Sequence, residues 1–391
     1  MALRLVLTFC VASAFAASAQ QAPESRPASR PVCGSLEVDR GVRVLRLSGT
    51  PREQGYAHGY LLAEEIPAFF DRIVVELRLG PVKLMTPKRY EETALSFVTR
   101  RGAFSADEEE ELAGMLEGME ARLGAPARSA ALGRPITLDD LKAGNSFGDW
   151  IPISCSSLST WGRFTADGGT ATVRNFDYPP HPELAARALL IARTPADPAK
   201  KAWATVGYPA FIGVLSGMSE AGVGLFVHDV NGRARPEGGR LVPRLLALRR
   251  TLEALDGKDA PAAALAALRS MDTYVGNNVH VTSPWDGAHA PAGVVEYDGD
   301  ESRGEGADLR GPEGDAVCCT NHFRLRATPT RCGRYARMRA ELEALASQGR
   351  KLDAAAGRAV ARAAAQNNPF SRTLHTVIFF PGARRFEVMF S

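Results

Sequence analysis

The sequence lacks the short motifs that mark several large classes of enzyme. Its 391 residues contain no Gly-rich phosphate loop, no dinucleotide fingerprint, no His-Glu-x-x-His zinc helix and no Gly-x-Ser-x-Gly turn. The histidines, of which there are 7, show no metal-ligand spacing, and no cysteine pair forms Cys-x-x-Cys. The sequence therefore favours neither a nucleotide-binding enzyme nor a zinc enzyme, and we expect no cofactor and no metal.

An excess of one sign of charge is also absent. Lys and Arg together number 47 and Asp and Glu 44, which gives a net charge of +3. The basic residues form only short clusters such as Arg249-Arg250, which we expect on solvated faces, so nucleic-acid binding is not predicted. Hydrophobic residues make up 45% of the chain and charged residues 23%, which is typical of a globular protein with a sizeable core.

No apolar run is long enough to predict a stable membrane span. The amino terminus instead has the pattern of a secretory signal peptide over residues 1–19, with a basic start, an apolar stretch and small residues at Ala17-Ser18-Ala19. We therefore expect an extracytoplasmic protein, periplasmic or secreted. A lipoprotein signal at Cys10 is an alternative, although Phe9 is larger than such a processing site usually accepts.

Cysteines are few, and an odd number remains beyond the signal peptide: Cys33, Cys155, Cys318, Cys319 and Cys332. In an oxidising compartment an odd count leaves at least one free thiol. Such a thiol is either reactive or a small buried hydrophobe, and the sequence leaves the disulfide pairing open.

The pattern of apolar residues divides the chain into three further parts. Residues 20–41 lack periodicity and are expected to form a flexible leader, and residues 42–154 are mainly helical, with a clear helix over 106–123 behind Ser105. Residues 155–391 alternate short strands, one of them over 211–215, with helices over 241–255, 261–271, 333–346 and 352–365, while 299–315 is expected to be an exposed loop. This order predicts stacked sheets covered by helices, an α+β architecture.

Three segments in this order carry the candidate chemistry. They are Pro152-Ile-Ser-Cys155-Ser-Ser, then Arg174-Asn-Phe-Asp-Tyr178, and much later Thr320-Asn321-His322-Phe323. Taken singly, a cysteine beside serines is more often structural than catalytic, and the second segment could be an ordinary strand end.

The ordered set resembles the cysteine N-terminal-nucleophile (Ntn) hydrolases, above all the acyl-coenzyme A:6-aminopenicillanate acyltransferase family. The segment 49–66 resembles the amino-terminal signature of that family and the segment 208–227 its glycine-rich central hairpin, so the resemblance covers most of the chain. Bile-salt hydrolases, N-acylethanolamine amidase and acid ceramidase are more distant relatives by the same pattern. The resemblance implies an αββα four-layer sandwich that acts on linear amides.

The resemblance also implies roles for individual residues. The chain is cut between Ser154 and Cys155, and Cys155 becomes an amino-terminal nucleophile whose own α-amine acts as base. Arg174 and Asp177 match the pair placed around that nucleophile, where guanidinium and carboxylate act as opposing influences on its pKa.

Three further residues match positions near the reacting carbonyl. Asn321 corresponds to the amide that helps to bind the oxyanion, and Arg334 to a second arginine near the site. Ser219 stands where relatives often have asparagine, and its backbone N–H is the candidate second oxyanion donor.

The sequence thus predicts an autoproteolytic amide hydrolase or acyltransferase whose partner is a small N-acyl amide, with a possible homo-oligomer of the processed two-chain form. Hydrolysis is favoured over transfer because acyl-coenzyme A is scarce outside the cytoplasm. Two alternatives stay open: an unprocessed cysteine peptidase that pairs Cys155 with His228 or His322, and a secreted binding protein that has kept the fold without catalysis.

Overall fold

The computed structural model describes residues 3–8, 31–79, 82–150, 154–230, 239–273, 276–298 and 306–390. Within these ranges the strands form a seven-stranded sheet, a nine-stranded sheet and two short hairpins. Sheet A has the strand order β1-β20-β19-β9-β8-β17, with β18 beside β19. It contains β1 (Leu3–Thr8), β8 (Ser154–Thr160), β9 (Ala171–Tyr178), β17 (Ala316–Cys319), β18 (Asn367–Asn368), β19 (Ser371–Phe380) and β20 (Arg385–Phe390).

Sheet B has the order β16-β15-β14-β13-β12-β11-β10-β3-β2. Its neighbours are antiparallel except β3 and β10, which run parallel. It contains β2 (Gly34–Asp39), β3 (Val42–Gly49), β10 (Leu189–Pro195), β11 (Trp203–Gly207), β12 (Ser216–Ser219), β13 (Gly224–Asp229), β14 (Asn277–Thr282), β15 (Ala292–Tyr297) and β16 (Ala307–Arg310). The two hairpins are β4 (Arg78–Leu79) with β5 (Val82–Lys83), and β6 (Arg128–Ser129) with β7 (Arg134–Pro135).

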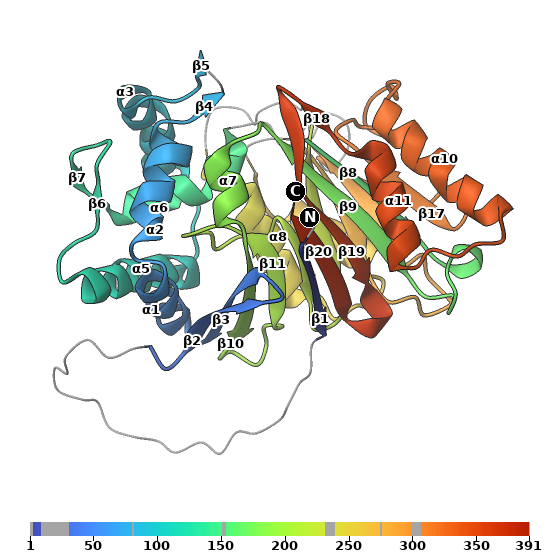
Figure 1. Ribbon diagram of the computed structural model, residues 1–391, viewed down its shortest axis with the longest axis horizontal. Coiled ribbons are helices and arrows are strands. Elements are labelled where there is room, and N and C mark those ends of the chain that lie inside the picture. The colour runs from blue at the N-terminus through green and yellow to red at the C-terminus, as the bar shows by residue number, and fades with distance from the viewer. Residues whose placement is uncertain are drawn as a thin grey trace.

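The helices of the amino-terminal part lie together on one side of the molecule (Figure 1). They are α1 (Pro51–Leu61), α2 (Glu65–Phe69), α3 (Pro87–Arg89), α4 (Ser96–Arg101), α5 (Ala106–Leu123) and α6 (Leu138–Asn145), with π-helical turns at Phe70–Val75 and Tyr90–Leu95. The later helices are α7 (Pro182–Arg187), α8 (Arg244–Ala254), α9 (Ala260–Arg269), α10 (Gly333–Ser347) and α11 (Ala354–Ala364).

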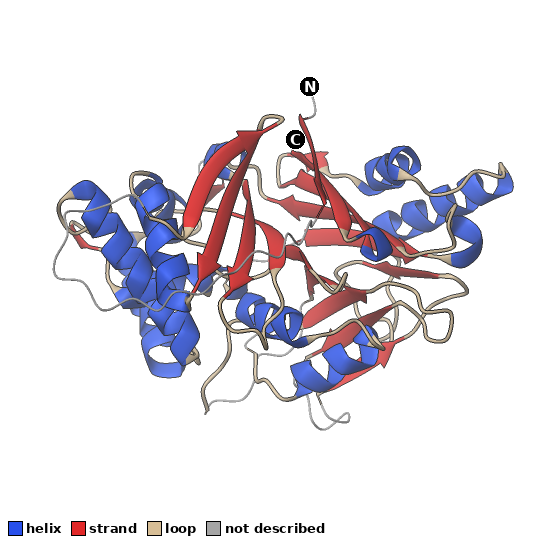
Figure 2. Ribbon diagram, turned by 90° about the horizontal axis from the view of Figure 1, so that it is seen from below, coloured by secondary structure: helices blue, strands red, loops and turns tan. Residues whose placement is uncertain are grey.

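The two sheets pack face to face. Val44 and Phe226 of sheet B belong to one buried apolar cluster with Val377, Phe379 and Val388 of sheet A. Helices cover the outer faces: α10 and α11 share a core cluster with sheet A, whereas α8 and α9 share one with sheet B. Figure 2 shows the strands in the middle of the molecule and helices at its edges. The prediction of an αββα sandwich is confirmed.

Helices α1 and α5 approach each other closely because glycines line their contact. A Cβ atom on Gly55 would lie 1.8 Å from the carbonyl oxygen of Glu111, and one on Gly59 would lie 2.0 Å from that of Met115. Both distances are shorter than atomic contact allows. This part of the sequence therefore needs glycine inside a helix, where it is otherwise unfavourable.

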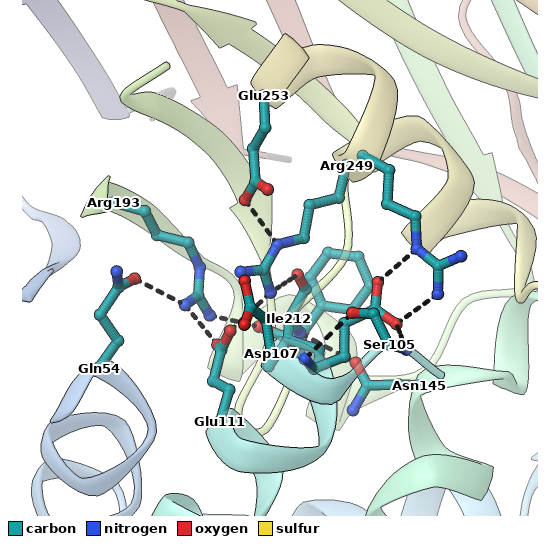
Figure 3. A network of polar contacts seen from close by, with 12 residues as sticks. Gln54, Ser105, Asp107, Glu111, Asn145, Arg193, Ile212, Arg249 and Glu253 are labelled. Atoms are coloured by element: carbon teal, nitrogen blue, oxygen red, sulfur yellow. Dashed lines mark hydrogen bonds and ion pairs between the residues drawn. The ribbon is translucent and has the colours of Figure 1, made fainter. Parts of the chain in front are cut away.

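A buried network of charges joins the amino-terminal helices to sheet B and α8 (Figure 3). Glu111 of α5 pairs with Arg193 of β10, and its other oxygen lies 2.6 Å from Nη1 of Arg249 in α8. Arg249 also bonds Glu253 at 2.8 Å, and Glu253 accepts the indole N–H of Trp203 at 3.0 Å. All five side chains are buried, so the network fixes how residues 42–154 sit on the rest of the chain.

The helix predicted over 106–123 is confirmed as α5, including a capping box at Ser105, and the four later helices are confirmed as α8 to α11. Three expectations are wrong in part. Residues 34–39 of the predicted leader form β2 beside β3, residues 307–310 of the predicted loop form the edge strand β16, and the strand expected over 211–215 is a loop.

The signal peptide stays a prediction. The backbone of Leu3–Thr8 pairs with β20 in the full chain, and the small residues 17–19 lie outside the described ranges. Among the helices that the structure describes, none combines the length and the apolar character that a membrane crossing requires.

Candidate active site

Cys155 is the second residue of β8, and the strand pairing decides where its thiol points. In the pairing of β8 with β9, Cys155 is opposite Phe176, Ser154 is opposite Asp177 and Ser157 is opposite Arg174. Because side chains alternate along a strand, Cys155, Arg174 and Phe176 share the face that packs on sheet B. Cys155 is fully buried there.

The sulfur of Cys155 is contacted by Arg174. Nη2 of Arg174 lies 3.1 Å from Sγ and 2.8 Å from the carbonyl oxygen of Val227 in β13. The backbone N–H of Asp177 also acts on the thiol and lowers its pKa. Both contacts favour negative charge on sulfur, as expected for a residue that becomes a nucleophile.

The backbone of Cys155 is held by two of the predicted site residues, Asn321 of the third segment and Arg334. Asn321 lies just beyond the end of β17, and its Oδ1 accepts the N–H of Cys155 at 2.8 Å. Arg334, in the first turn of α10, donates to the carbonyl oxygen of Cys155 at 2.8 Å and to Oδ1 of Asn321 at 2.9 Å. The backbone of Cys155 is therefore fixed on both sides of its Cα atom.

Asp177 joins this arrangement from the opposite face of β9. Its three-residue separation from Arg174 sends the two side chains to different faces of the sheet, rather than side by side. Asp177 accepts from Nη1 of Arg334 at 3.0 Å and from the hydroxyl of Thr373 in β19 at 2.6 Å. Arg334 thus links the carboxylate of Asp177 to the backbone of Cys155.

Burial dominates the electrostatics of the uncut chain. It raises the pKa of the Cys155 thiol to about 11, although Arg174 and Arg334 act in the opposite direction. Burial also raises the pKa of Asp177, against the influence of Thr373 and Arg334. Near neutral pH the thiol is therefore protonated in this state, and it needs a base before it can attack a carbonyl.

Ser219 is not brought to this cluster, which corrects its assignment as an oxyanion donor. It ends β12 at the hairpin turn, and its N–H donates to the carbonyl oxygen of Val223 at 2.9 Å. The contacts with Arg174 and Asn321 come from Val227 and Asp229, at the other end of β13. A sheet hydrogen bond therefore occupies the N–H that was expected to bind substrate.

The two histidines considered as partners of Cys155 have other neighbours. Nε2 of His228 lies 2.8 Å from the hydroxyl of Ser157, and burial holds the pKa of His228 well below its usual value. The same hydroxyl lies 2.6 Å from Nδ1 of His280, so the three residues form one polar contact between the sheets. Nδ1 of His322 faces Thr320 at 3.5 Å. This arrangement favours a buried polar support beneath the site over a Cys/His pair.

An apolar pocket lies next to the strand pair that carries the thiol. The space between its lining residues, including the part open to solvent, is about 790 Å³. Residues on both sides of the predicted cleavage point line it, among them Phe69, Phe70, Val74, Leu141 and Phe147 before it and Phe176, Tyr178, Tyr208, Phe211 and Leu245 after it. Sequence reasoning missed this pocket, since no short motif joins residues so far apart.

The backbone hydrogen bonds of the segment 211–215 explain why it is a loop rather than a strand. Asn145 of α6 accepts the N–H of Ile212 at 2.9 Å and donates to the carbonyl oxygen of Ala210 at 3.0 Å. The N–H of Val214 donates to the carbonyl oxygen of Leu245. These partners replace a strand ladder, and they tie one wall of the pocket to the amino-terminal helices.

The other candidate ligand groups give no sign of a metal site or of a disulfide. In the ranges that the structure covers, no group of three His, Cys, Asp or Glu side chains is placed to hold a metal ion. The thiols of Cys33, Cys155, Cys318, Cys319 and Cys332 are all free.

No protein-family model and no curated protein matches this sequence. Solved structures match it in fold. An N-acylethanolamine-hydrolyzing acid amidase ortholog from Caenorhabditis elegans is 15% identical, with a TM-score of 0.43 over 58% of this chain and 93% of that chain. The C2A mutant of conjugated bile acid hydrolase from Clostridium perfringens is 12% identical, with a TM-score of 0.41 over 58% and 86%.

Penicillin V acylase from Agrobacterium tumefaciens is 13% identical, with a TM-score of 0.40 over 58% of this chain and 80% of that chain. The structures to which this chain is similar thus include an N-acylethanolamine-hydrolyzing amidase and a bile acid hydrolase, two of the kinds of enzyme named in the sequence resemblance.

Proposed function

We propose that this protein is a precursor that cuts its own chain before Cys155 and then hydrolyses linear amides of apolar acyl groups. One observation carries the proposal: the N–H, the carbonyl and the thiol of Cys155 are each held by a different side chain, from Asn321, Arg334 and Arg174. A structural cysteine needs none of these contacts, whereas a residue that must become a precisely placed terminal nucleophile needs all three.

The proposed self-cleavage transfers the acyl group from nitrogen to sulfur and then to water. The Cys155 sulfur attacks the carbonyl carbon of Ser154, the Ser154–Cys155 C–N bond breaks, and the thiol proton passes to the departing nitrogen. Water then hydrolyses the thioester, which leaves a carboxylate on Ser154 and a free thiol on Cys155. The nitrogen that Asn321 now holds as a peptide N–H becomes the α-amine of the new chain.

The same residues then serve the substrate. An α-amine has a pKa near 7.7 to 8.0, so it can accept the thiol proton at neutral pH while Arg174 stabilises the thiolate. The thiolate attacks the amide carbonyl, and the side-chain amide of Asn321 is the proposed donor to the oxyanion. The amine leaves with the proton from the α-ammonium group, and water resolves the thioester to a carboxylic acid.

The pocket indicates which kind of acyl group the substrate carries. Its lining is mostly apolar and aromatic. Phe176 lines it and is also the residue of β9 that pairs with Cys155. An apolar chain attached to the reacting carbonyl can therefore enter the pocket while the carbonyl stays at the thiol. Small acyl groups such as acetyl would leave the pocket unfilled and forgo most of the binding energy.

Hydrolysis of N-acyl amides by the purified protein tests the proposal, with Cys155→Ala and Cys33→Ala as matched variants. Wild-type protein and Cys33→Ala should release decanoic acid from an N-decanoyl amide, and Cys155→Ala should release none. Activity that survives in Cys155→Ala would contradict the proposal. So would a wild-type protein that leaves a broad panel of N-acyl amides intact.

A further inference from the structure

The pocket contains two polar groups that its apolar character does not explain. Tyr178, at the end of β9, and Tyr208, in the loop after β11, both line it and are only 4% and 9% exposed. Neither hydroxyl has a hydrogen-bond partner among the described residues. A buried hydroxyl without a partner costs about 1–3 kcal/mol, so phenylalanine would be the stabler choice at both positions.

Ring contacts hold both tyrosines in place. Tyr178 stacks on Phe176, with ring centroids 5.9 Å apart and planes inclined by 12°. Tyr208 stacks on Phe69 of α2 at 5.6 Å and 13°. Because four aromatic rings fix these orientations, the hydroxyls cannot readily turn toward a protein acceptor elsewhere.

Both tyrosines line the same pocket, and Tyr178 lies two residues after Phe176, the β9 partner of Cys155, on the same face of the sheet. Burial raises the pKa of Tyr178, and Tyr208 adds to this effect, so both phenols stay protonated and able to donate. Burial likewise raises the pKa of Tyr208, although Arg174 acts in the opposite direction. The two tyrosines thus form a polar part of the pocket, and Tyr178 belongs to the strand that pairs with the strand of Cys155.

Arg174, which contacts the Cys155 sulfur and is not among the residues that line the pocket, is a further buried donor. It is fully buried, and its Nε and Nη1 atoms have no partner in the described part of the chain. No Asp or Glu is among the described residues that line the pocket, so its walls supply no carboxylate for these donors. The polar part of the pocket therefore offers two O–H groups to whatever enters it.

We infer that Tyr178 and Tyr208 are specificity-determining residues that bind an oxygen substituent on the acyl group, within the first few carbons of the reacting carbonyl. The inference rests on the proposed function and deepens it. The preferred substrates are amides of hydroxyacyl groups rather than of plain hydrocarbon chains. The oxygen substituent satisfies the two hydroxyls, and the remaining chain fills the apolar part of the pocket.

A matched substrate pair tests this inference: the N-decanoyl and N-(3-hydroxydecanoyl) amides of the same amine. Wild type should prefer the hydroxy substrate by about tenfold in kcat/KM, the effect of one buried hydrogen bond. Tyr178→Phe and Tyr208→Phe should bring that ratio close to one. Tyr60→Phe, in α1 and outside the pocket lining, should keep the wild-type ratio.

Binding to the uncut Cys155→Ala protein gives a readout that does not need catalysis. Displacement of a fluorescent fatty acid should show tighter binding of 3-hydroxydecanoic acid than of decanoic acid, and Tyr208→Phe in this background should remove the difference. If neither amide is hydrolysed but this difference is found, the proposed function fails and the tyrosine site stands. If both amides are hydrolysed and the ratio of their kcat/KM values is the same in wild type and in both Phe variants, the tyrosine site is overturned and the proposed function stands.

Discussion

Oδ1 of Asn321 accepts the backbone N–H of Cys155 at 2.8 Å, although the two residues are 166 positions apart in sequence. Nδ2 of the same side chain donates to the carbonyl oxygen of Asp229 at 2.7 Å. The amide is therefore fixed at both ends beside the candidate nucleophile. A neutral donor that does not reorganise during the reaction is what an oxyanion requires.

Asn321→Ala should lower kcat much more than it raises KM, because the oxyanion exists only in the tetrahedral state. Loss of one such donor typically lowers kcat by about 10² to 10³. The measurement is steady-state hydrolysis of an N-acyl amide by the processed fraction alone, since maturation passes through a similar oxyanion and should also slow. Asn368→Ala, at an exposed position in β18, is the control. A kcat within a few-fold of wild type would exclude the role of Asn321.

The family resemblance, carried by short motifs, named residues that the structure brings together around Cys155. The segment from Arg174 to Tyr178 alternates along one strand, and the pairing of β8 with β9 brings it to Cys155. The contacts of Thr373 with Asp177, and of Val227 with Arg174, could not be predicted in this way. They depend on which strands become neighbours within a sheet and on which strands of the two sheets face each other, and one sequence does not specify either.

Ser219 shows the converse limit. Its place in a glycine-rich hairpin was predicted correctly, but the position of the turn along β12 and β13 decides whether its N–H points to substrate or to the opposite strand. The N–H is bonded to Val223, so a shift of a few residues along the hairpin separates the expectation from the structure.

Arg174→Met should shift the pH dependence of self-cleavage to higher pH. In the uncut chain the thiol pKa is about 11, and Arg174 lowers it. Below that pKa the thiolate fraction rises about tenfold per pH unit, so the cleavage rate should rise with pH. Removal of the guanidinium raises the thiol pKa, by about one to three units for an adjacent opposite charge, and so slows cleavage at any given pH.

The pH dependence is measured as the rate of appearance of the cut chains between pH 6 and 10. Arg350→Met, at an exposed position after α10, should give the wild-type profile. Superimposable profiles for Arg174→Met and wild type would show that the contact between Arg174 and sulfur does not activate the thiol.

Gly144→Leu should abolish the preference for long acyl chains. Gly144 lines the pocket within α6, and a Cβ atom there meets only Phe70 and Val74, both at 3.9 Å. The position therefore tolerates a side chain that projects into the hollow. Each buried methylene contributes about 0.8 kcal/mol, or about fourfold in kcat/KM, until the pocket is full.

The test is kcat/KM over N-acyl amides of increasing chain length, for wild type, Gly144→Ala and Gly144→Leu. The value of kcat/KM should stop rising at successively shorter acyl chains in that order. The same plateau in all three proteins would mean that the acyl chain binds elsewhere.

Glu111→Gln should weaken the association of the two chains after cleavage. Glu111 balances Arg193 and Arg249 in the buried network of Figure 3, and it comes from the chain that cleavage separates from the other two. Loss of one partner from a buried charge network costs about 3–5 kcal/mol, because the remaining charges stay buried and uncompensated. Urea unfolding of the processed protein should show a correspondingly lower midpoint.

Glu110→Gln is the matched control, because Glu110 is the adjacent residue and pairs with Arg52 at the surface. Surface ion pairs of this kind contribute little to the free energy of unfolding, so the urea midpoint of Glu110→Gln should stay near that of wild type. Equal midpoints for Glu111→Gln and Glu110→Gln would show that the network does not hold the chains together.

The central claim is that Cys155 becomes an amino-terminal residue. Amino-terminal sequencing with intact mass on the purified protein tests it most directly. We predict a fragment that begins Cys-Ser-Ser-Leu and has a mass of about 25 kDa, scaled by residue number from the 41.9 kDa chain. The Cys155→Ala protein should stay uncut. A wild-type protein that hydrolyses N-acyl amides while residues 154 and 155 remain joined would contradict the account.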